Sequence, residues 1–277
     1  QLYAINQTEN LNFLTRFREL LDSYPNKTSI GEIGDSHRAI EIMQEYTRDS
    51  KLHMAYSFEL LGKEFSASFI QSTLEKFFED NKESWPCWSF SNHDVERHVS
   101  RWDPKESKEF AKLTSALLLS LKGTPCLYQG EELGQTETKL EFKELTDPPG
   151  IRYWPENKGR DGCRTPMTWN RNSLNAGFST FKPWLPVKEK QKLNSVNIQE
   201  EDDKSILNFY KEFLDLRRKR NELLEGEMEF LPSKEDVLMF TRETKASKLL
   251  CIFNLNTDKH LFEEFKDHQI EVVISSN

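Results

Sequence analysis

The feature that most constrains the fold is a regular alternation of short apolar runs with longer amphipathic segments. Apolar runs typical of buried strands cover residues 28–34, 53–58, 87–91 and 124–130. Segments with apolar residues at helical spacing cover residues 11–24, 37–48, 65–78, 106–121 and 206–221. Strands that alternate with helices along a chain pair in parallel, with the helices as crossovers. The pattern therefore predicts an α/β fold with a parallel sheet.

Two regions depart from this alternation. Residues 131–204 are polar and rich in Pro, Gly and Trp, and they are too long for an ordinary connection. We therefore expect them to form a functional loop excursion. From residue 226 onward, β-rich runs flank a charged turn, which predicts a small all-β domain. The expected domains are residues 1–225, with the excursion inside, and residues 226–277.

Length and charge narrow the class of protein. The chain has 277 residues, enough for one large domain or for one domain with a small appendage. Its net charge of −8 argues against a nucleic-acid partner, because such a protein would carry a basic face. No apolar run approaches the roughly 20 residues that a membrane helix needs. These features fit a soluble protein that binds a neutral or cationic ligand.

The cysteines argue against a zinc site. Cys87, Cys126, Cys163 and Cys251 are widely spaced and form no Cys-x-x-Cys pair, and we predict no metal site in this chain. Thiols of this kind fit a reducing compartment, so we expect a cytoplasmic protein.

The amino end resembles neither a start methionine nor a signal peptide, so we expect the chain to be part of a longer protein.

The apolar run at 87–91 ends in three polar side chains, Asn92, His93 and Asp94. In a barrel of parallel strands, catalytic groups lie where strands end and loops begin. The segment therefore indicates an active-site wall, although it would also suit a solvated turn that caps the next helix. His93 could donate a hydrogen bond to a ligand hydroxyl, or lie in the core bonded to a carbonyl. Arg97, one helical turn after Asp94, could orient a carboxylate or form a surface salt bridge.

Glu32 supplies a second candidate carboxylate. It lies between glycines in an apolar strand, where a buried carboxylate is costly unless it is paired or used. We expect Glu32 to be buried and to serve as a general acid. The alternative is an exposed strand end with Glu32 salt-bridged to an arginine. Two carboxylates on neighbouring strand ends, here Glu32 and Asp94, are what glycoside hydrolysis requires.

Two later segments could add contacts to such a site. Glu131 and Glu132 follow the last of the apolar runs, and we favour a bracing role for them over a direct substrate contact. Within residues 159–169, Arg164 and Trp169 could line a sugar site, because sugars stack on aromatic faces and accept hydrogen bonds from arginine. The alternative for these residues is an ordered surface loop.

Taken together, these stretches resemble the α-amylase superfamily (glycoside hydrolase family thirteen), and most closely its α-glucosidase and oligo-1,6-glucosidase branch. The strand with Glu32 resembles the segment that carries the general acid/base of the family. Residues 90–94 resemble the segment with the transition-state-stabilising aspartate and its neighbouring histidine. Residues 123–134 are similar to the last barrel strand, and residues 159–169 and 183–187 are similar to signatures of the glucosidase branch.

The resemblance implies a fold and a set of roles. The fold would be the second half of a (β/α)8 TIM barrel, strands five to eight, followed by the small all-β domain. Glu32 and Asp94 would be the catalytic residues of a retaining, exo-acting α-glucosidase that releases terminal α-linked glucose from oligosaccharides or disaccharides. The substrate-binding residues would be Asn92, His93, Arg97, Arg164 and Trp169.

The chain also lacks segments that the family has. The family's nucleophilic aspartate lies on strand four, after an Asp-x-x-x-Asn-His segment, and this sequence has neither. We therefore expect the amino-terminal half, which would supply the nucleophile, as a separate or cleaved chain or as another part of the same protein. The implied mechanism requires no cofactor. A structural Ca²⁺ or Mg²⁺, as in some relatives, would lie in that other half.

Rival activities stay open at this stage. An α-glucosyl transferase, a sucrose hydrolase or an isomaltulose synthase on the same fold would share the residues named above. A non-catalytic relative, such as the glucosidase-like ectodomain of amino-acid transporter heavy chains, is the other alternative. That class tends to lose its acid/base and its aspartate, whereas Glu32 and Asp94 are both present here.

Overall fold

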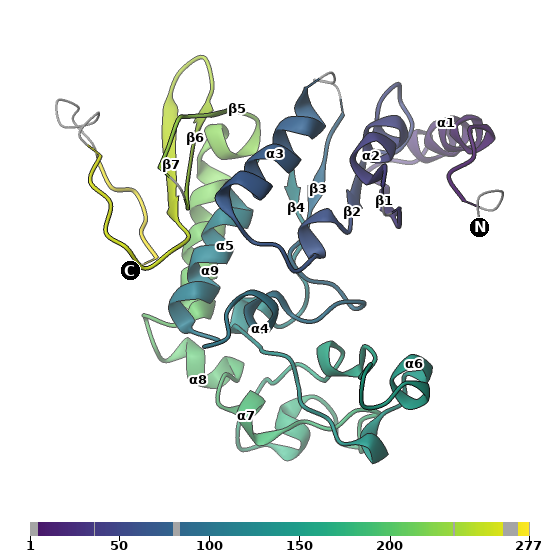
Figure 1. Cartoon of the computed structure of the whole chain (residues 1–277), viewed down its shortest axis with the longest axis vertical. Coiled ribbons are helices and arrows are strands. Elements are labelled where there is room, and N and C mark those ends of the chain that lie inside the picture. Colours follow the sequence, from purple (N-terminus) through teal and green to yellow (C-terminus); the bar gives the residue numbers. More distant parts are fainter. Residues whose placement is uncertain (1–4, 36, 80–83, 235, 263–270, 277) are drawn as a thin grey trace.

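The computed structural model describes residues 5–35, 37–79, 84–234, 236–262 and 271–276. Its centre is a row of short parallel strands with helices packed against them (Figure 1). Strand β1 (Ile30–Ile33) pairs in parallel with β2 (Met54–Ser57), and β3 (Cys87–Trp88) pairs in parallel with β4 (Thr124–Pro125). A parallel bridge between Ala55 and Pro86 joins the two pairs. The strands therefore lie in chain order, which confirms the parallel pairing that the sequence predicted.

The long helices form where the apolar spacing predicted them. Serine side chains cap several of them: the hydroxyls of Ser66, Ser107 and Ser205 accept backbone N–H groups at 3.2, 3.3 and 3.0 Å. One face of each capped helix then packs into the core. The long helices are α1 (Glu9–Asp22), α2 (Ala39–Thr47), α3 (Ala67–Phe78), α5 (Lys108–Ser120) and α9 (Ile206–Lys219). Shorter turns are η1 (Glu59–Leu61), α4 (His98–Trp102) and α10 (Asn221–Leu224).

Strands β3 and β4 are shorter than the sequence predicted. After Trp88 the chain leaves the sheet, and side chains form hydrogen bonds around the loop that follows. The Ser89 hydroxyl donates to the carbonyl of Ser91 at 2.6 Å, and the Ser91 hydroxyl lies 2.9 Å from Nδ1 of His98. The apolar runs at 87–91 and 124–130 therefore begin as strands and end as ordered loops.

Residues 131–204 form an ordered layer of short helical turns that follows β4 (Figure 1). Buried glutamines hold this layer to the rest of the molecule. Gln199 donates to the carbonyl of Leu133 at 2.8 Å and accepts the backbone N–H of Leu207 at 2.9 Å. The excursion is therefore a defined wall. Its turns are η2 (Glu131–Leu133), η3 (Phe142–Glu144), α6 (Pro148–Arg152), η4 (Asp161–Cys163), η5 (Leu174–Gly177), α7 (Glu189–Lys192) and α8 (Val196–Glu200).

An antiparallel sheet follows α10, in the order β5 (Glu227–Phe230), β6 (Val237–Glu243) and β7 (Lys248–Asn254). Apolar side chains of β6 and β7 belong to the same hydrophobic core as the helices. Arg242 of β6 is buried, and it donates to the carbonyls of Ser120, at the end of α5, at 2.7 Å and of Gly226 at 3.0 Å. These bonds tie the sheet to α5. The described residues after Asn254 form no strand, so the sheet is smaller than the predicted segment 226–277.

Candidate active site

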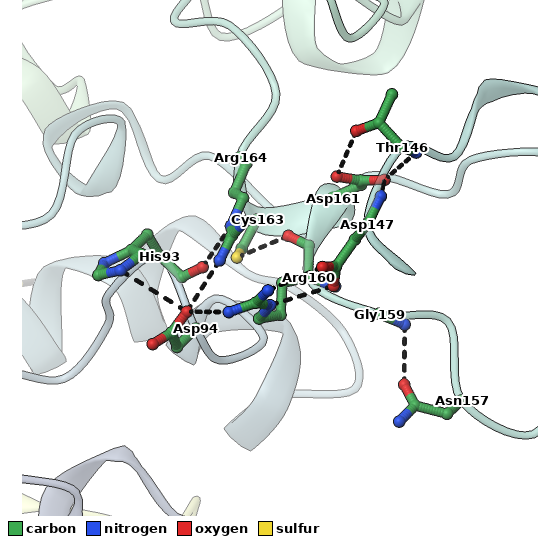
Figure 2. A network of polar contacts seen from close by, with 10 residues as sticks. All are labelled: His93, Asp94, Thr146, Asp147, Asn157, Gly159, Arg160, Asp161, Cys163 and Arg164. Atoms are coloured by element: carbon green, nitrogen blue, oxygen red, sulfur yellow. Dashed lines mark hydrogen bonds and ion pairs between the residues drawn. The ribbon is translucent and has the colours of Figure 1, made fainter. Parts of the chain in front are cut away.

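Asp94 lies at the centre of a cluster of charged groups, shortly after the end of β3 (Figure 2). Its Oδ1 atom accepts hydrogen bonds from Arg160 Nη1 at 2.9 Å and from Arg164 Nη2 at 2.8 Å. The ring Nε2 of His93 lies 3.6 Å from the same oxygen. The Asp94 side chain is 27% exposed. Figure 2 shows its second oxygen, Oδ2, without a contact to the other residues drawn, so this oxygen can accept a hydrogen bond from a ligand.

Asn92 and His93 shape the turn that presents Asp94. The buried Asn92 side chain accepts the Asp94 backbone N–H on Oδ1 at 2.8 Å, which closes the turn. The His93 imidazole is 56% exposed, so it is not the core histidine that the sequence left open. The His93 carbonyl accepts a hydrogen bond from Arg164 Nε at 2.6 Å. Arg164 therefore holds both the backbone of this turn and the carboxylate of Asp94.

The core histidine is His98, which packs against the same turn and which the sequence reasoning did not single out. Its Nδ1 lies 2.9 Å from Ser91 Oγ and 3.2 Å from Glu131 Oε1, and its Nε2 lies 3.0 Å from Thr114 Oγ1. His98 and Glu131 are both buried. The Glu131 carboxylate also accepts the backbone N–H of Tyr128 at 3.0 Å. Glu131 is therefore a brace beneath the site, as the sequence favoured.

Arg97 does not reach a surface where a substrate could bind, and this corrects the substrate-binding role expected for it. The residue is only 1% exposed, and burial lowers the pKa of its guanidinium. It donates to the carbonyls of Gln129 at 2.7 Å and Cys163 at 2.9 Å, and its central carbon lies 4.9 Å from the centroid of the Tyr128 ring. The turn after Asp94 directs Arg97 inward, where it ties the loops after β3 and β4 to the excursion.

Glu32 of β1 lies opposite Tyr56 of β2 in the parallel register. The residue is exposed, which corrects the expectation that it would be buried. The reason is the position of β1 in the sheet. Among the described strands β1 pairs with β2 alone, so no neighbouring strand covers its other edge.

Tyr56 connects Glu32 to the turn that carries Asp94. Burial raises the pKa of the Tyr56 phenol, the charge of the Glu32 carboxylate raises it further, and the side chain of Asn92 acts in the opposite direction. Effects of this kind require the phenol to lie close to both side chains. Glu32 and Asn92 are therefore both neighbours of Tyr56, which lies beside Glu32 in the strand register. Asn92 Nδ2 is buried and has no hydrogen-bond partner among the described residues.

Trp169 lies on the surface, 49% exposed, in a turn of its own. Its backbone N–H donates to the carbonyl of Ala176 at 2.8 Å, and its carbonyl accepts the N–H of Asn197 at 3.0 Å. In the part of the chain that the structure describes, no ring contact joins its indole to the Asp94 cluster. The structure therefore brings together Asn92, His93, Asp94 and Arg164 through hydrogen bonds, and it places Glu32 on a strand that runs parallel to the one before Asp94.

Arg160 is the residue of this cluster that the sequence reasoning missed. It joins Asp94 to Asp147, a buried carboxylate that directly precedes α6 (Figure 2). Nη2 of Arg160 donates to Asp147 Oδ1 at 2.8 Å, and Nε donates to Oδ2 at 3.1 Å. Local spacing gave no signal for it. Arg160 and Arg164 flank the 3₁₀ turn η4, in which residues three apart, and not four apart, share a face.

Neither a metal centre nor a membrane segment is found in the described ranges. No group of three or more His, Cys, Asp or Glu among the described residues is arranged to hold a metal ion. No described helix combines the length and apolar character that crossing a membrane requires. The expected absence of a metal in this chain stays a prediction.

Comparison with known proteins identifies the family. Residues 1–226 match the sequence model of the α-amylase catalytic domain. A probable α-glucosidase from Rhizobium meliloti (strain 1021) is 43% identical over 261 residues, which cover 93% of this chain and 47% of that protein. An oligo-1,6-glucosidase from Heyndrickxia coagulans is 31% identical over 290 residues, 91% of this chain and 51% of that protein. The chain thus spans about half the length of the curated relatives it matches.

Solved structures agree with the sequence matches. The α-glucosyl transfer enzyme XgtA superposes with a TM-score of 0.87 at 47% sequence identity, over 91% of this chain and 47% of that one. Trehalulose synthase MutB from Pseudomonas mesoacidophila MX-45 superposes with a TM-score of 0.78 at 23% identity, over 90% of this chain and 51% of that one, and shares the fold. The chain therefore belongs to the α-amylase family, whose catalytic domain has the TIM-barrel fold.

Proposed function

We propose that the complete protein is a retaining, exo-acting α-glucosidase that releases terminal α-linked glucose from oligosaccharides or disaccharides. In this proposal Glu32 is the general acid/base and Asp94 is the transition-state-stabilising aspartate. The observation that carries the proposal is that Glu32, near the end of β1, and the turn of Asp94, after the end of β3, both lie at the carboxyl end of the row of parallel strands. Similarity to a probable α-glucosidase and to an oligo-1,6-glucosidase supports it.

The proposed reaction is a double displacement. A nucleophilic aspartate from outside this chain attacks the anomeric carbon, while Glu32 protonates the leaving glycosidic oxygen. A covalent glycosyl-enzyme forms, and Glu32 then removes a proton from the water that hydrolyses it. Oδ1 of Asp94 is held by two arginines, which leaves Oδ2 to accept a hydroxyl of the distorted sugar ring.

Three further residues would bind the same sugar. The exposed imidazole of His93 can donate to a hydroxyl. Arg164, whose side chain is partly exposed beside Asp94, can contact an oxygen of the sugar in addition to the turn. The side-chain Nδ2 of Asn92, for which the described residues supply no acceptor within hydrogen-bond distance, is a further donor beside Asp94. Arg97 is left out of this set because it is buried.

We also propose that β1 to β4 are strands five to eight of a (β/α)8 barrel, within a domain of residues 1–225 that includes the excursion 131–204. Residues 226–277 would be the carboxyl-terminal β domain. Parallel strands in chain order support this arrangement, as does the span of about half of each relative. The partner would be the amino-terminal half, as a separate or cleaved chain or as part of the same protein. Ile30 on β1 and Phe13 and Leu20 on α1 are exposed apolar side chains that such a partner could cover.

The partner can be tested by reconstitution. The chain is purified alone and together with the amino-terminal remainder of the protein, and both samples are assayed with a chromogenic α-glucoside. The proposal expects activity only when the two parts are present together. Full activity of the chain alone would contradict it, because Glu32 and Asp94 would then work without an external nucleophile.

The catalytic roles are tested in the complete protein by Glu32→Gln and Asp94→Asn. Each should lower kcat by a factor on the order of 10³ or more, without a change in the melting temperature. Glu156→Gln, at an exposed position, is the matched control. Near-normal activity in either variant would end the assignment of that residue.

An α-glucosyl transferase is the second candidate, and the similarity to XgtA, described as an α-glucosyl transfer enzyme, favours it. Sucrose hydrolase and isomaltulose synthase activities belong to the same group of alternatives. Product analysis with maltose, isomaltose and sucrose separates them, because a hydrolase releases glucose and a transferase forms new α-glucosides. A non-catalytic role is disfavoured by the presence of both Glu32 and Asp94.

The proposed mechanism uses protein side chains alone, so no cofactor enters it. A structural Ca²⁺ or Mg²⁺ would lie outside this chain. Activity that survives exhaustive treatment with EDTA would fit this view, and a loss restored by Ca²⁺ would show that the complete enzyme needs the ion.

The free thiols of the cysteines fit a cytoplasmic location, which fractionation of the source cells would test.

A further inference from the structure

We propose that Arg160 and Asp147 form a positioning pair that holds the Asp94 carboxylate in its productive orientation. The inference rests on the role proposed above for Asp94 and extends it to residues of the excursion. Asp147 is too deep to touch a ligand, since only 1% of its side chain is exposed. Any effect of Asp147 on Asp94 must therefore pass through Arg160.

Asp147 sets the plane of the Arg160 guanidinium. Its Oδ1 accepts Arg160 Nη2 at 2.8 Å, and its Oδ2 accepts Arg160 Nε at 3.1 Å and the Arg160 backbone N–H at 2.8 Å. A two-pronged pair of this kind restricts a guanidinium far more than a single contact does. Hydrogen bonds from Arg160 hold the pKa of the Asp147 carboxyl below its usual range, so the carboxylate stays charged.

The remaining side of the guanidinium faces Asp94. With Nε and Nη2 bound to Asp147, Nη1 has a fixed position and donates to Asp94 Oδ1 at 2.9 Å (Figure 2). Arg164 Nη2 binds the same oxygen at 2.8 Å. Two donors on one oxygen restrict rotation of the carboxylate and keep the other oxygen available for a ligand.

The two arginines differ in what holds them. The Arg164 side chain is bound to the turn of Asp94, through the His93 carbonyl at 2.6 Å, while its backbone lies in the excursion, where its N–H donates to the carbonyl of Asp161 at 3.1 Å. Arg160 is anchored outside the turn, on Asp147. Both arginines thus connect Asp94 to the excursion, and Arg160 is the one whose guanidinium a buried carboxylate also holds.

The excursion around Asp147 is well anchored. Asp161 is fully buried, and its Oδ2 accepts the backbone N–H groups of Thr146 at 2.6 Å and of Asp147 at 2.8 Å. Asp161 therefore holds the backbone of Asp147, Asp147 holds Arg160, and Arg160 holds Asp94. This series connects the packed excursion to the carboxylate.

The test uses the complete enzyme and steady-state kinetics with a chromogenic α-glucoside. Arg160→Met and Asp147→Asn should each lower kcat by about 10- to 100-fold, with a much smaller change in KM, because a misdirected carboxylate mainly affects the transition state. The double variant should be no worse than Arg160→Met alone, because the two residues act as one unit. Arg152→Met, an exposed arginine of the neighbouring α6, should keep wild-type kinetics.

Arg160→Lys provides the second variant, because it keeps the charge and the fold but cannot form the two-pronged contact. It should stay impaired, and wild-type kcat in this variant would overturn the inference. Normal activity in Asp147→Asn beside an impaired Arg160→Met would also overturn it, since Arg160 would then act on the ligand directly. Additive losses in the double variant would do the same.

A crystal structure of Asp147→Asn in the complete enzyme separates this inference from the proposed function. The Asp94 carboxylate should move by on the order of 1 Å or change rotamer. An unmoved Asp94 overturns the positioning pair whatever the kinetics show. A wild-type enzyme without activity on any α-glucoside would instead refute the proposed function, and the position of Asp94 would still decide the inference.

Discussion

Glu32 of β1 and Tyr56 of β2 are register partners in a parallel pair of strands, and the Glu32 charge contributes to the raised pKa of the half-buried Tyr56 phenol. A phenol whose pKa is raised keeps its proton over the physiological range. Because Tyr56 lies beside Glu32 in the strand register, we expect its hydroxyl to donate a hydrogen bond to the Glu32 carboxylate and to orient it. This relationship gives the proposed acid/base a partner within this chain.

Tyr56→Phe should lower kcat in the complete enzyme by about 3- to 10-fold, which corresponds to the loss of one hydrogen bond. The measurement is steady-state kinetics with a chromogenic α-glucoside. Tyr46→Phe is the control, since that phenol contacts Asn6 and Asn10 near the amino end. Wild-type kcat in Tyr56→Phe would show that the phenol does not act on Glu32.

Arg97→Met should destabilise the protein without a direct effect on substrate binding. The substitution removes two charge-assisted hydrogen bonds, to the carbonyls of Gln129 and Cys163. The Cys163 carbonyl keeps a hydrogen bond from the Tyr128 hydroxyl at 3.1 Å, whereas the Gln129 carbonyl loses its side-chain donor. The expected loss is about 3–5 kcal/mol of the free energy of unfolding, measured by urea denaturation. Arg171→Met, at an exposed position, should change little. A loss as small as that of the control would mean that Arg97 is not a brace.

Glu137 should make stability depend on pH. Burial raises the pKa of this carboxyl from 4.5 to about 7. Between these values the folded protein binds more protons than the unfolded chain. The contribution of Glu137 to the free energy of unfolding is therefore complete below about pH 4.5 and is lost as the pH rises through 7. At about 1.4 kcal/mol per pKa unit, the free energy of unfolding falls by roughly 3 kcal/mol in total across this pH range.

Glu137→Gln tests this dependence, because glutamine is neutral at every pH. In the variant, the free energy of unfolding should no longer fall with pH through the titration of residue 137. The variant should also be more stable than the wild type above pH 7, as measured by urea denaturation from pH 5 to pH 8. Glu156→Gln, on the exposed surface, should keep the wild-type slope. Parallel stability curves for Glu137→Gln and the wild type would contradict the assignment.

Trp169→Ala should raise KM more than it lowers kcat. Its indole is largely free on the surface, so it can offer an aromatic face to a sugar ring. A lost aromatic contact of about 0.5–1.5 kcal/mol corresponds to a rise in KM of roughly 2- to 10-fold. Trp184→Ala is a matched control at another exposed tryptophan. Unchanged kinetics would leave Trp169 as part of an ordered surface loop.

The long helices could be predicted because their signals are local. Segment 106–121 was expected to be helical, and α5 forms at Lys108–Ser120 behind the cap of Ser107. The predicted strands were too long, because a run of apolar residues indicates burial but does not indicate pairing with another strand. Phe90, for example, is as buried as Trp88, although only Trp88 belongs to β3. The turns of the excursion escaped prediction because they depend on long-range bonds such as that from Gln199 to Leu133.

By itself, the sequence determined which chemical groups stand at the ends of the strands: Glu32, His93 and Asp94, with Arg164 in a recognisable later segment. Only the tertiary structure decided which arginines meet Asp94. Arg97, one turn away in sequence, is directed into the core, whereas Arg160, 66 residues away, donates to the carboxylate. The physical reason is that a side chain's partners are set by how distant loops pack together, and no local pattern of residues encodes that packing.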